Sequence, residues 1–297
     1  MQENVKFWSG EAKNISISAV IHVPDDIKAS ERKPAVIVLH GFGSTKDAKN
    51  VTGPTNMFLR WGYIVLRFDM RGCGASDGLP GHLICLEQVE DTQAAITFLE
   101  GRLEVDTERI CLVGSSFGAA VAVYTGGVDE RVSAVISSGG WGNGERKFRG
   151  QHSTPEAWEE FKRMLDESRK YRKKTKKHMI VDRFAIVPIP EHLRNNLPVG
   201  SIQKFTAETA HGMMEFNAEE LIGSMASRPI LLLHSSVDSV TPTEQSIEMF
   251  KRAGQPAELH LTADTDHFMF AESNTRVIGI ISDWLSTYFP VDRNPNA

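Results

Sequence analysis

A serine stands between two glycines in residues 114–118, whose sequence is Gly-Ser-Ser-Phe-Gly. The segment follows the apolar run 110–113 and precedes small residues that are compatible with a helix. In such a strand, sharp turn and helix, the middle residue is strained and exposed, and the glycines are needed where a Cβ would collide with neighbouring backbone. The spacing therefore selects Ser116, and not Ser115, as a candidate nucleophile in a nucleophile elbow.

A serine hydroxyl needs a base to take its proton and an acid to orient that base. Asp238 follows the apolar run 230–233, and His267 follows a predicted short strand at 257–261. Both residues fall at the carboxyl ends of predicted strands, where open α/β sheets assemble their sites. Asp264 and Asp266 are rival acids, although Asp266 is adjacent to His267 in the sequence and adjacent side chains in an extended loop usually diverge. We therefore expect a catalytic triad of Ser116, His267 and Asp238.

A tetrahedral intermediate also needs hydrogen-bond donors for its oxyanion. The segment His-Gly-Phe-Gly at 40–43 follows the apolar run 35–39, so its backbone can offer an N–H at the same edge of a sheet. The residue after the nucleophile supplies the second donor in this kind of turn. We expect an oxyanion hole formed by the main-chain amides of Phe42 and Phe117.

Short apolar runs alternate with helical patterns along the chain, which predicts an α/β fold with a mostly parallel central sheet flanked by helices. Residues 15–21 alternate apolar and polar, as in a half-exposed antiparallel strand near one edge. The predicted strands lie at 15–21, 35–39, 63–68, 110–113, 132–136, 230–233 and 257–261, and helices are predicted around 86–99, after 241 and at 277–288.

Residues 141–220 interrupt this alternation. They are rich in charge, carry four prolines and have a net positive charge, whereas the rest of the chain is net negative. We predict an α/β core of residues 1–140 and 221–297 and a largely helical lid insertion at 141–220. Its basic run 169–177 favours a solvated helix face over a nucleic-acid patch, and could steer an acidic substrate. An apolar ceiling over the site is expected from Trp158, Phe161, Met164, Leu165, Met213, Met214 and Phe216.

Composition narrows the classes of protein further. The 297 residues are 41% hydrophobic and 24% charged with a net charge of -5, which is typical of a folded enzyme and argues against nucleic-acid or membrane partners. Three cysteines indicate no disulfide framework and favour a reducing, cytoplasmic location. No metal-ligand spacing or dinucleotide fingerprint is found, so we expect no cofactor and no metal. The sequence is compatible with a homodimer.

Taken together, these motifs resemble the α/β-hydrolase superfamily. Residues 68–78 are similar to the family's D-x-R-G-x-G-x-S segment, which the resemblance implies is mainly structural. The 40–43 segment is similar to the loop of cinnamoyl and feruloyl esterases, in which the residue corresponding to Phe42 gives an oxyanion N–H. The insertion at 141–220 is longer than the lid of those esterases, so their substrate contacts do not carry over.

The expected function is a serine hydrolase that cleaves a carboxylic ester or related acyl bond of a small molecule through an acyl-enzyme. The same triad also serves amidases or peptidases, thioesterases or acyltransferases, and C–C bond hydrolases. A different class, a non-catalytic ligand-binding protein on the same scaffold, is disfavoured because a receptor has no need of His267.

Overall fold

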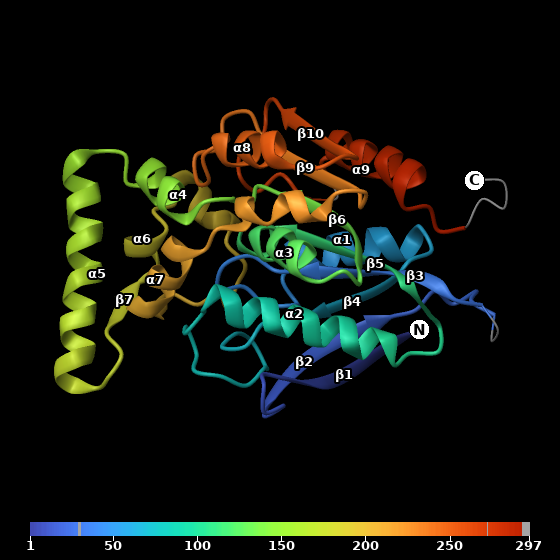
Figure 1. Cartoon of the computed structure of the whole chain (residues 1–297), viewed down its shortest axis with the longest axis horizontal. Coiled ribbons are helices and arrows are strands. Elements are labelled where there is room, and N and C mark those ends of the chain that lie inside the picture. Colours follow the sequence, from blue (N-terminus) through green and yellow to red (C-terminus); the bar gives the residue numbers. More distant parts are fainter. Residues whose placement is uncertain (29–30, 272, 293–297) are drawn as a thin grey trace.

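The computed structural model describes residues 1–28, 31–271 and 273–292. The centre of the fold is an eight-stranded sheet (Figure 1). Its strand order is β1-β2-β4-β3-β5-β6-β9-β10. Strand β2 pairs antiparallel with both of its neighbours, β1 and β4, and all the other neighbouring strands pair in parallel. The strands are β1 (Gln2–Ser9), β2 (Ile15–His22), β3 (Lys33–Leu39), β4 (Ile64–Phe68), β5 (Val105–Ser115), β6 (Val132–Ser138), β9 (Ile230–Ser235) and β10 (Ala257–Thr262).

Helices cover both faces of this sheet, which is why its central strands are apolar on both sides. Alternate residues of β3 separate into two buried clusters, with Ile37 packed in the cluster of α2, α3 and α8, and Val38 in the cluster of α1 and α9. The helices are α1 (Lys49–Arg60), α2 (Cys85–Glu100), α3 (Phe117–Val128), α8 (Glu244–Arg252) and α9 (Thr275–Tyr288). The α/β-hydrolase fold expected from the sequence is therefore confirmed.

The antiparallel edge of the sheet extends one strand further than the sequence predicts. Residues 15–21 form β2, which pairs with β4 on one side and with β1 on the other. The polar residues of β1 are mostly exposed, so this edge strand carries little hydrophobic pattern. Its pairing with β2, and not its composition, makes it a strand.

The segment 141–220 lies between β6 and β9 and is largely helical. Beside its helices it contains a two-stranded antiparallel sheet that the sequence analysis did not anticipate. Its elements are α4 (Gly144–Gln151), α5 (Pro155–Thr175), β7 (Ile180–Asp182), α6 (Arg183–Ile186), η1 (Glu191–Asn196), β8 (Lys204–Thr206), α7 (Ala207–Glu215) and η2 (Ala218–Glu220), and η3 (Ile222–Met225) follows it.

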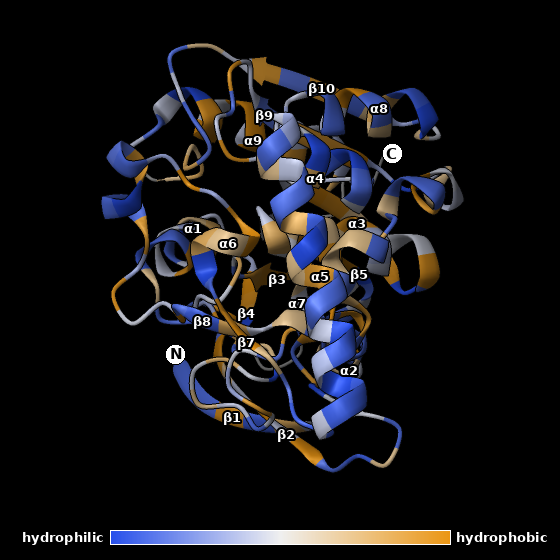
Figure 2. Ribbon diagram, turned by 90° about the vertical axis from the view of Figure 1, so that its left-hand side faces the viewer, coloured by the Kyte–Doolittle hydropathy of each residue, from blue (hydrophilic) through white to orange (hydrophobic). Residues whose placement is uncertain are grey.

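Helix α5 is the outermost element of this segment. It stands at the left of Figure 1, with α4, α6 and α7 between it and the sheet, and it packs on α7. Figure 2 shows mostly hydrophilic residues along α5 and apolar residues along the central strands β3 and β4. Within the described residues, no helix is both long and apolar enough to cross a membrane.

Candidate active site

Ser116 occupies the sharp turn between β5 and α3 with φ 57° and ψ -115°. A Cβ on Gly114 would come within 2.2 Å of the Gly118 carbonyl oxygen, and one on Gly118 within 2.6 Å of the His40 carbonyl oxygen. The Ser116 amide donates to the Ser138 carbonyl at 2.8 Å, which ties the turn to β6. The two glycines are thus required by close backbone packing, as the motif implies.

The structure brings Ser116, His267 and Asp238 together from three separate loops. His267 Nε2 lies 2.8 Å from Ser116 Oγ, and His267 Nδ1 lies 2.8 Å from Asp238 Oδ2. The carboxyl group is fully buried and the imidazole is nearly so. A base in contact with a hydroxyl on one side and an acid on the other is the arrangement that activates a serine.

The Asp238 carboxylate is held by backbone amides as well as by His267. Its Oδ1 accepts hydrogen bonds from the amides of Val240 and Thr241, at 2.8 and 2.7 Å. Burial acts to raise the pKa of Asp238, but the neighbouring His267, together with hydrogen bonds from His234 and His267, holds that pKa below its usual value. Asp238 therefore stays ionised, as an acid that orients an imidazole must.

A second histidine, His234, supports the acid and was missed as a site residue by the sequence analysis. Its Nε2 lies 3.0 Å from the Thr241 carbonyl oxygen and 3.3 Å from Asp238 Oδ2. Both neighbours are acceptors, so Nε2 carries the proton, while Nδ1 faces Ser246 Oγ at 2.6 Å. The sequence indicates this contact only through the position of His234, which lies at the end of β9 and four residues before Asp238.

The rival acids do not contact the imidazole of His267. Asp266 accepts from the amide and hydroxyl of Ser239, both at 2.8 Å, and so connects the two loops that carry Asp238 and His267. Asp264 is exposed at the turn after β10 with φ 59°. The geometry therefore favours Asp238 over both.

The loop after β3 lies directly beside Ser116. A Cβ on Gly41 would be 3.8 Å from the Ser116 Cβ, and the Phe42 and Phe117 rings have centroids 5.9 Å apart. Within the described residues, neither the Phe42 nor the Phe117 amide donates a hydrogen bond to the protein. Two free amides beside the serine are suited to bind an oxyanion.

Residues of the 141–220 segment hold this loop in place. The guanidinium of Arg183 donates from Nη2 to the Phe42 carbonyl at 2.7 Å, and the Ile202 amide donates to the Gly43 carbonyl at 2.9 Å. The Phe205 ring stacks on the Phe42 ring with centroids 4.2 Å apart. We call Arg183, Ile202 and Phe205 the loop clamp. The sequence analysis did not predict this clamp, because no local sequence pattern indicates that residue 42 contacts residues 183–205.

Ser116 and His267 line a small cavity of about 40 Å³. It adjoins a hollow of about 810 Å³, with which it shares Asn50, Ser115, Leu197, Pro198 and Phe268. The cavity residues from the 141–220 segment are Arg183, Val187, Ile189, Leu197 and Pro198.

The apolar ceiling predicted from the sequence is therefore wrong in its residues. Phe161, Leu165, Met213 and Phe216 are buried in the main core, and Trp158, Met164 and Met214 pack against that core. The helical periodicity marked them correctly as apolar but did not say which buried surface they meet. The residues of the segment that line the Ser116 cavity are instead Arg183 and four residues of the short, proline-containing stretch 187–198.

The 68–78 segment makes buried ion pairs away from the nucleophile. Asp69 accepts from Lys46 Nζ at 2.7 Å, and Arg71 donates to Asp91 at 2.8 Å. A Cβ on Gly74 would collide with the Asp69 carboxylate. These contacts fit the structural role that the resemblance implies for this loop.

This sheet topology, with a serine at the β5 turn and a histidine and an aspartate after β10 and β9, defines an α/β hydrolase. The chain belongs to the family described as serine aminopeptidase, S33, whose family model matches residues 30–274.

Relatives cover most of the chain. An uncharacterised 31.7 kDa protein from Escherichia coli is 26% identical over 92% of this chain and 96% of its own length. The polyketide transferase grgF from Penicillium sp is 27% identical over 80% of this chain and 82% of its own. Among solved structures, Est1E from Butyrivibrio proteoclasticus with ferulic acid bound superposes with a TM-score of 0.67 at 15% identity, covering 96% and 98% of the two chains. That likeness concerns the fold.

Proposed function

We propose that this hydrolase cleaves a carboxylic ester, or a related acyl bond, through a covalent intermediate on Ser116. The observation that carries the proposal is the pair of 2.8 Å contacts that His267 makes, one with Ser116 Oγ and one with Asp238 Oδ2. Non-catalytic binding does not require a serine, a histidine and an aspartate in contact, whereas acyl transfer through a serine does require a base and an acid that orients it.

The proposed reaction runs in two halves. Ser116 Oγ attacks the acyl carbon as its proton passes to His267 Nε2, and the Phe42 and Phe117 amides hold the oxyanion. His267 then gives the proton to the departing alcohol, which leaves the acyl group on Ser116. Water, deprotonated by His267, cleaves that ester and restores the serine.

Acyl transfer is the second candidate. Relatives that cover most of the chain include a protein named polyketide transferase grgF and one named acyltransferase drtE. Transfer uses the same acyl-enzyme and differs only in the acceptor, which is an alcohol or amine in place of water. The larger hollow beside the Ser116 cavity offers room for such an acceptor.

A fluorophosphonate probe tests the nucleophile directly. We expect one adduct per chain on Ser116, none in Ser116→Ala, and undiminished labelling in Ser115→Ala, because only the central residue of the turn projects toward His267. Turnover of a p-nitrophenyl ester should fall by about 10⁴-fold or more in Ser116→Ala. An unlabelled protein, or equal losses in the two variants, would refute the proposal.

A substrate panel separates the candidate reactions. p-Nitrophenyl esters, aryl amides, acyl thioesters and β-diketones represent ester, amide, thioester and C–C bond cleavage. Each active substrate is then tested with added alcohols and amines. Free acid as the sole product supports hydrolysis, whereas a new ester or amide supports transfer.

A further inference from the structure

Three side chains with metal-binding atoms meet away from the active site. His82, His178 and Glu208 each place one ligand atom within 4.8 Å of the others, and the His82 and His178 rings have centroids 5.0 Å apart. His82 belongs to the loop between β4 and α2, whereas His178 precedes β7 and Glu208 lies in the first turn of α7. The group therefore joins the core of the fold to the 141–220 segment.

A chain of hydrogen bonds fixes the protonation of His82. The Thr209 hydroxyl donates to the Gly81 carbonyl at 3.1 Å, so its contact with Thr206 at 3.3 Å is donated by the Thr206 hydroxyl. Thr206 Oγ1 must then accept from His82 Nδ1, which lies 2.8 Å away. The proton is on Nδ1, and the lone pair of Nε2 is left free for a metal ion.

Thr206 contacts Nδ1 of His82, and Thr209 supports Thr206 in turn. Both threonines are fully buried, so the supporting hydrogen bonds are shielded from water. A metal-bound histidine usually has such a partner on its second nitrogen.

The other two side chains present polar atoms that lack hydrogen-bond partners in the described residues. Glu208 Oε2 is buried and has no partner there, and His178 Nδ1 is buried and meets only Glu208 Oε1, at 3.0 Å, without hydrogen-bond geometry. Leaving buried polar atoms unpaired is costly, and a bound cation would satisfy both.

We propose that His82, His178 and Glu208 form a zinc site that fastens the 141–220 segment to the core. Two imidazoles and one carboxylate are a donor set that zinc prefers. In a tetrahedral zinc site, ligand atoms lie about 3.3 Å apart, so side-chain shifts of about 1 Å close the group around the ion. This inference is independent of the proposed acyl chemistry.

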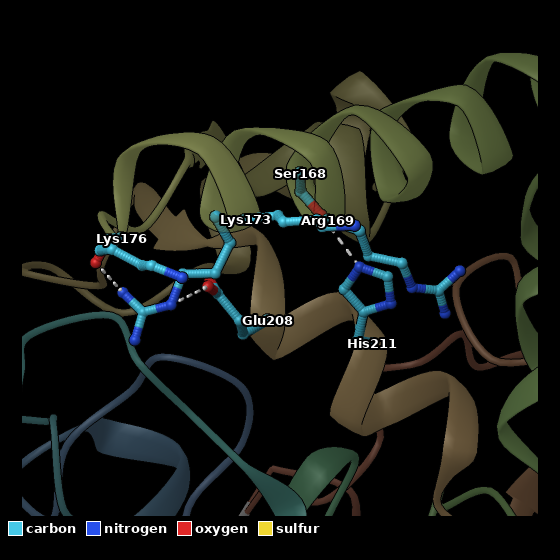
Figure 3. A pocket seen from close by; sticks show the side chains of 7 residues that line it. Ser168, Arg169, Lys173, Lys176, Glu208 and His211 are labelled. Carbon is cyan, nitrogen blue, oxygen red and sulfur yellow. Dashed lines mark hydrogen bonds and ion pairs between the residues drawn. The ribbon is translucent and has the colours of Figure 1, made fainter.

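Of the three proposed ligands, Glu208 lines a surface hollow of about 400 Å³. Figure 3 shows Glu208 at this hollow, beneath α5, with Ser168 and His211 further along it. Arg172 is the nearest opposing charge, with Nε 3.9 Å from Glu208 Oε1. It is half-exposed, and Nη1 donates to the Lys176 carbonyl at the end of α5. Its side chain can therefore turn into solvent when a cation binds.

Titration of the chelator-treated full chain with Zn²⁺ tests the site. We expect one tight equivalent per chain, a rise in Tm of at least about 2 °C at saturation, and a tetrahedral visible spectrum with Co²⁺. His82→Asn, His178→Asn and Glu208→Gln should each weaken zinc binding at least tenfold. Thr206→Val should weaken it roughly tenfold through the orientation of His82.

His260→Asn is the matched control, because His260 and Glu258 form a surface pair at the same 3.0 Å separation but have no third ligand among the residues that the structure describes. Zinc affinity should be unchanged in this variant. The proposal is overturned if the unmodified chain takes up no zinc at micromolar concentration, a result that does not depend on the folding of any variant. It is equally overturned if the three ligand variants bind zinc as tightly as the control.

Discussion

At the scale of single residues, Asp238 is the member of the proposed triad with the most contacts. Its carboxylate accepts hydrogen bonds from two backbone amides and contacts the rings of His267 and His234, so its position is set independently of substrate. Asp238→Asn keeps the size of the side chain but removes the charge that stabilises the imidazolium. We expect kcat to fall by about 10⁴-fold with little change in KM, measured by steady-state kinetics.

Asp266→Asn is the control for that prediction. It retains an acceptor for Ser239, and the Asp266 carboxylate makes no contact with the His267 ring. A loss of less than tenfold is expected. If Asp266→Asn, and not Asp238→Asn, proves the severe change, the acid has been misassigned.

Lys147 is a second residue whose charge matters. Its side chain is buried, with Nζ donating to Gln151 Oε1 at 2.8 Å and lying 3.9 Å above the Phe148 ring. Burial lowers the pKa of Lys147 to about 7, although the contact with the ring favours the charged form. Between pH 7 and about 10.5 the unfolded chain binds this proton and the folded chain does not, so the folded state gains stability as pH rises.

Lys147→Met removes this pH dependence. The variant should be more stable than the unmodified chain at pH 6–7, and the difference in the free energy of unfolding should shrink toward pH 10 by up to about 1.4 kcal/mol per pH unit. Urea denaturation across this range measures it. Lys162→Met is the control, because Lys162 also lies over a ring but is exposed on α5. A pH-independent difference for Lys147→Met means that the amine stays charged when buried.

At the scale of elements, the loop clamp connects the 141–220 segment to the loop of Phe42, whose amide is one of the two donors proposed for the oxyanion. Arg183 Nη1 donates to the Ile202 carbonyl at 2.8 Å, and Nη2 donates to the Phe42 carbonyl. One guanidinium therefore joins α6, the residues just before β8 and the loop after β3. Gly43 is needed here, because a Cβ would come within 2.6 Å of the Phe205 ring and its φ is 57°. Arg183 is a positioning residue, since it acts on the oxyanion amide through the Phe42 backbone.

Arg183→Met should therefore lower kcat by about 10- to 100-fold, less than the roughly 10²- to 10³-fold that loss of an oxyanion donor itself costs, because the amide stays in place, and should change KM much less. The rate of fluorophosphonate labelling should fall in parallel. Arg194→Met is the matched control, because Arg194 also lies over a ring of this segment, that of Phe184, without touching Phe42. If the two variants lose activity equally, the clamp serves only the stability of the segment.

These elements also show which parts of the fold can be predicted from the sequence. The buried strands and the triad were predictable, because apolar runs fix the parallel strands and their carboxyl ends place Ser116, Asp238 and His267 at one edge. Strand β1, the β7–β8 pair and the clamp were not, because they depend on pairings between distant residues that leave no local pattern. The helix after β9 was predicted to follow residue 241 directly. It begins at Glu244, and Thr243 Oγ1 donates to the Ser235 carbonyl.

At the scale of the whole molecule, the positive charge of the 141–220 segment is concentrated far out on α5. The division into a core of 1–140 and 221–297 and a lid of 141–220 remains a prediction, as does steering by the basic run 169–177. Arg169, Arg172, Lys173 and Lys176 line the hollow of Glu208 and His211, which shares no residue with the Ser116 cavity. Charges that do not reach the cavity act on a substrate only through the long-range field, which salt screens over about 8 Å at physiological ionic strength.

Neutralising Arg169, Lys170, Lys173 and Lys174 to Gln tests this separation, because the exposed side chains are replaced without touching Arg172 or the zinc ligands. At physiological salt, KM for a carboxylated p-nitrophenyl ester and for a neutral ester of equal length should each change less than about twofold. At low salt, KM for the carboxylated ester alone should rise, because unscreened steering is then lost. A selective rise at both salt concentrations would instead mean that the run contacts the bound substrate, and that α5 closes over the site during turnover.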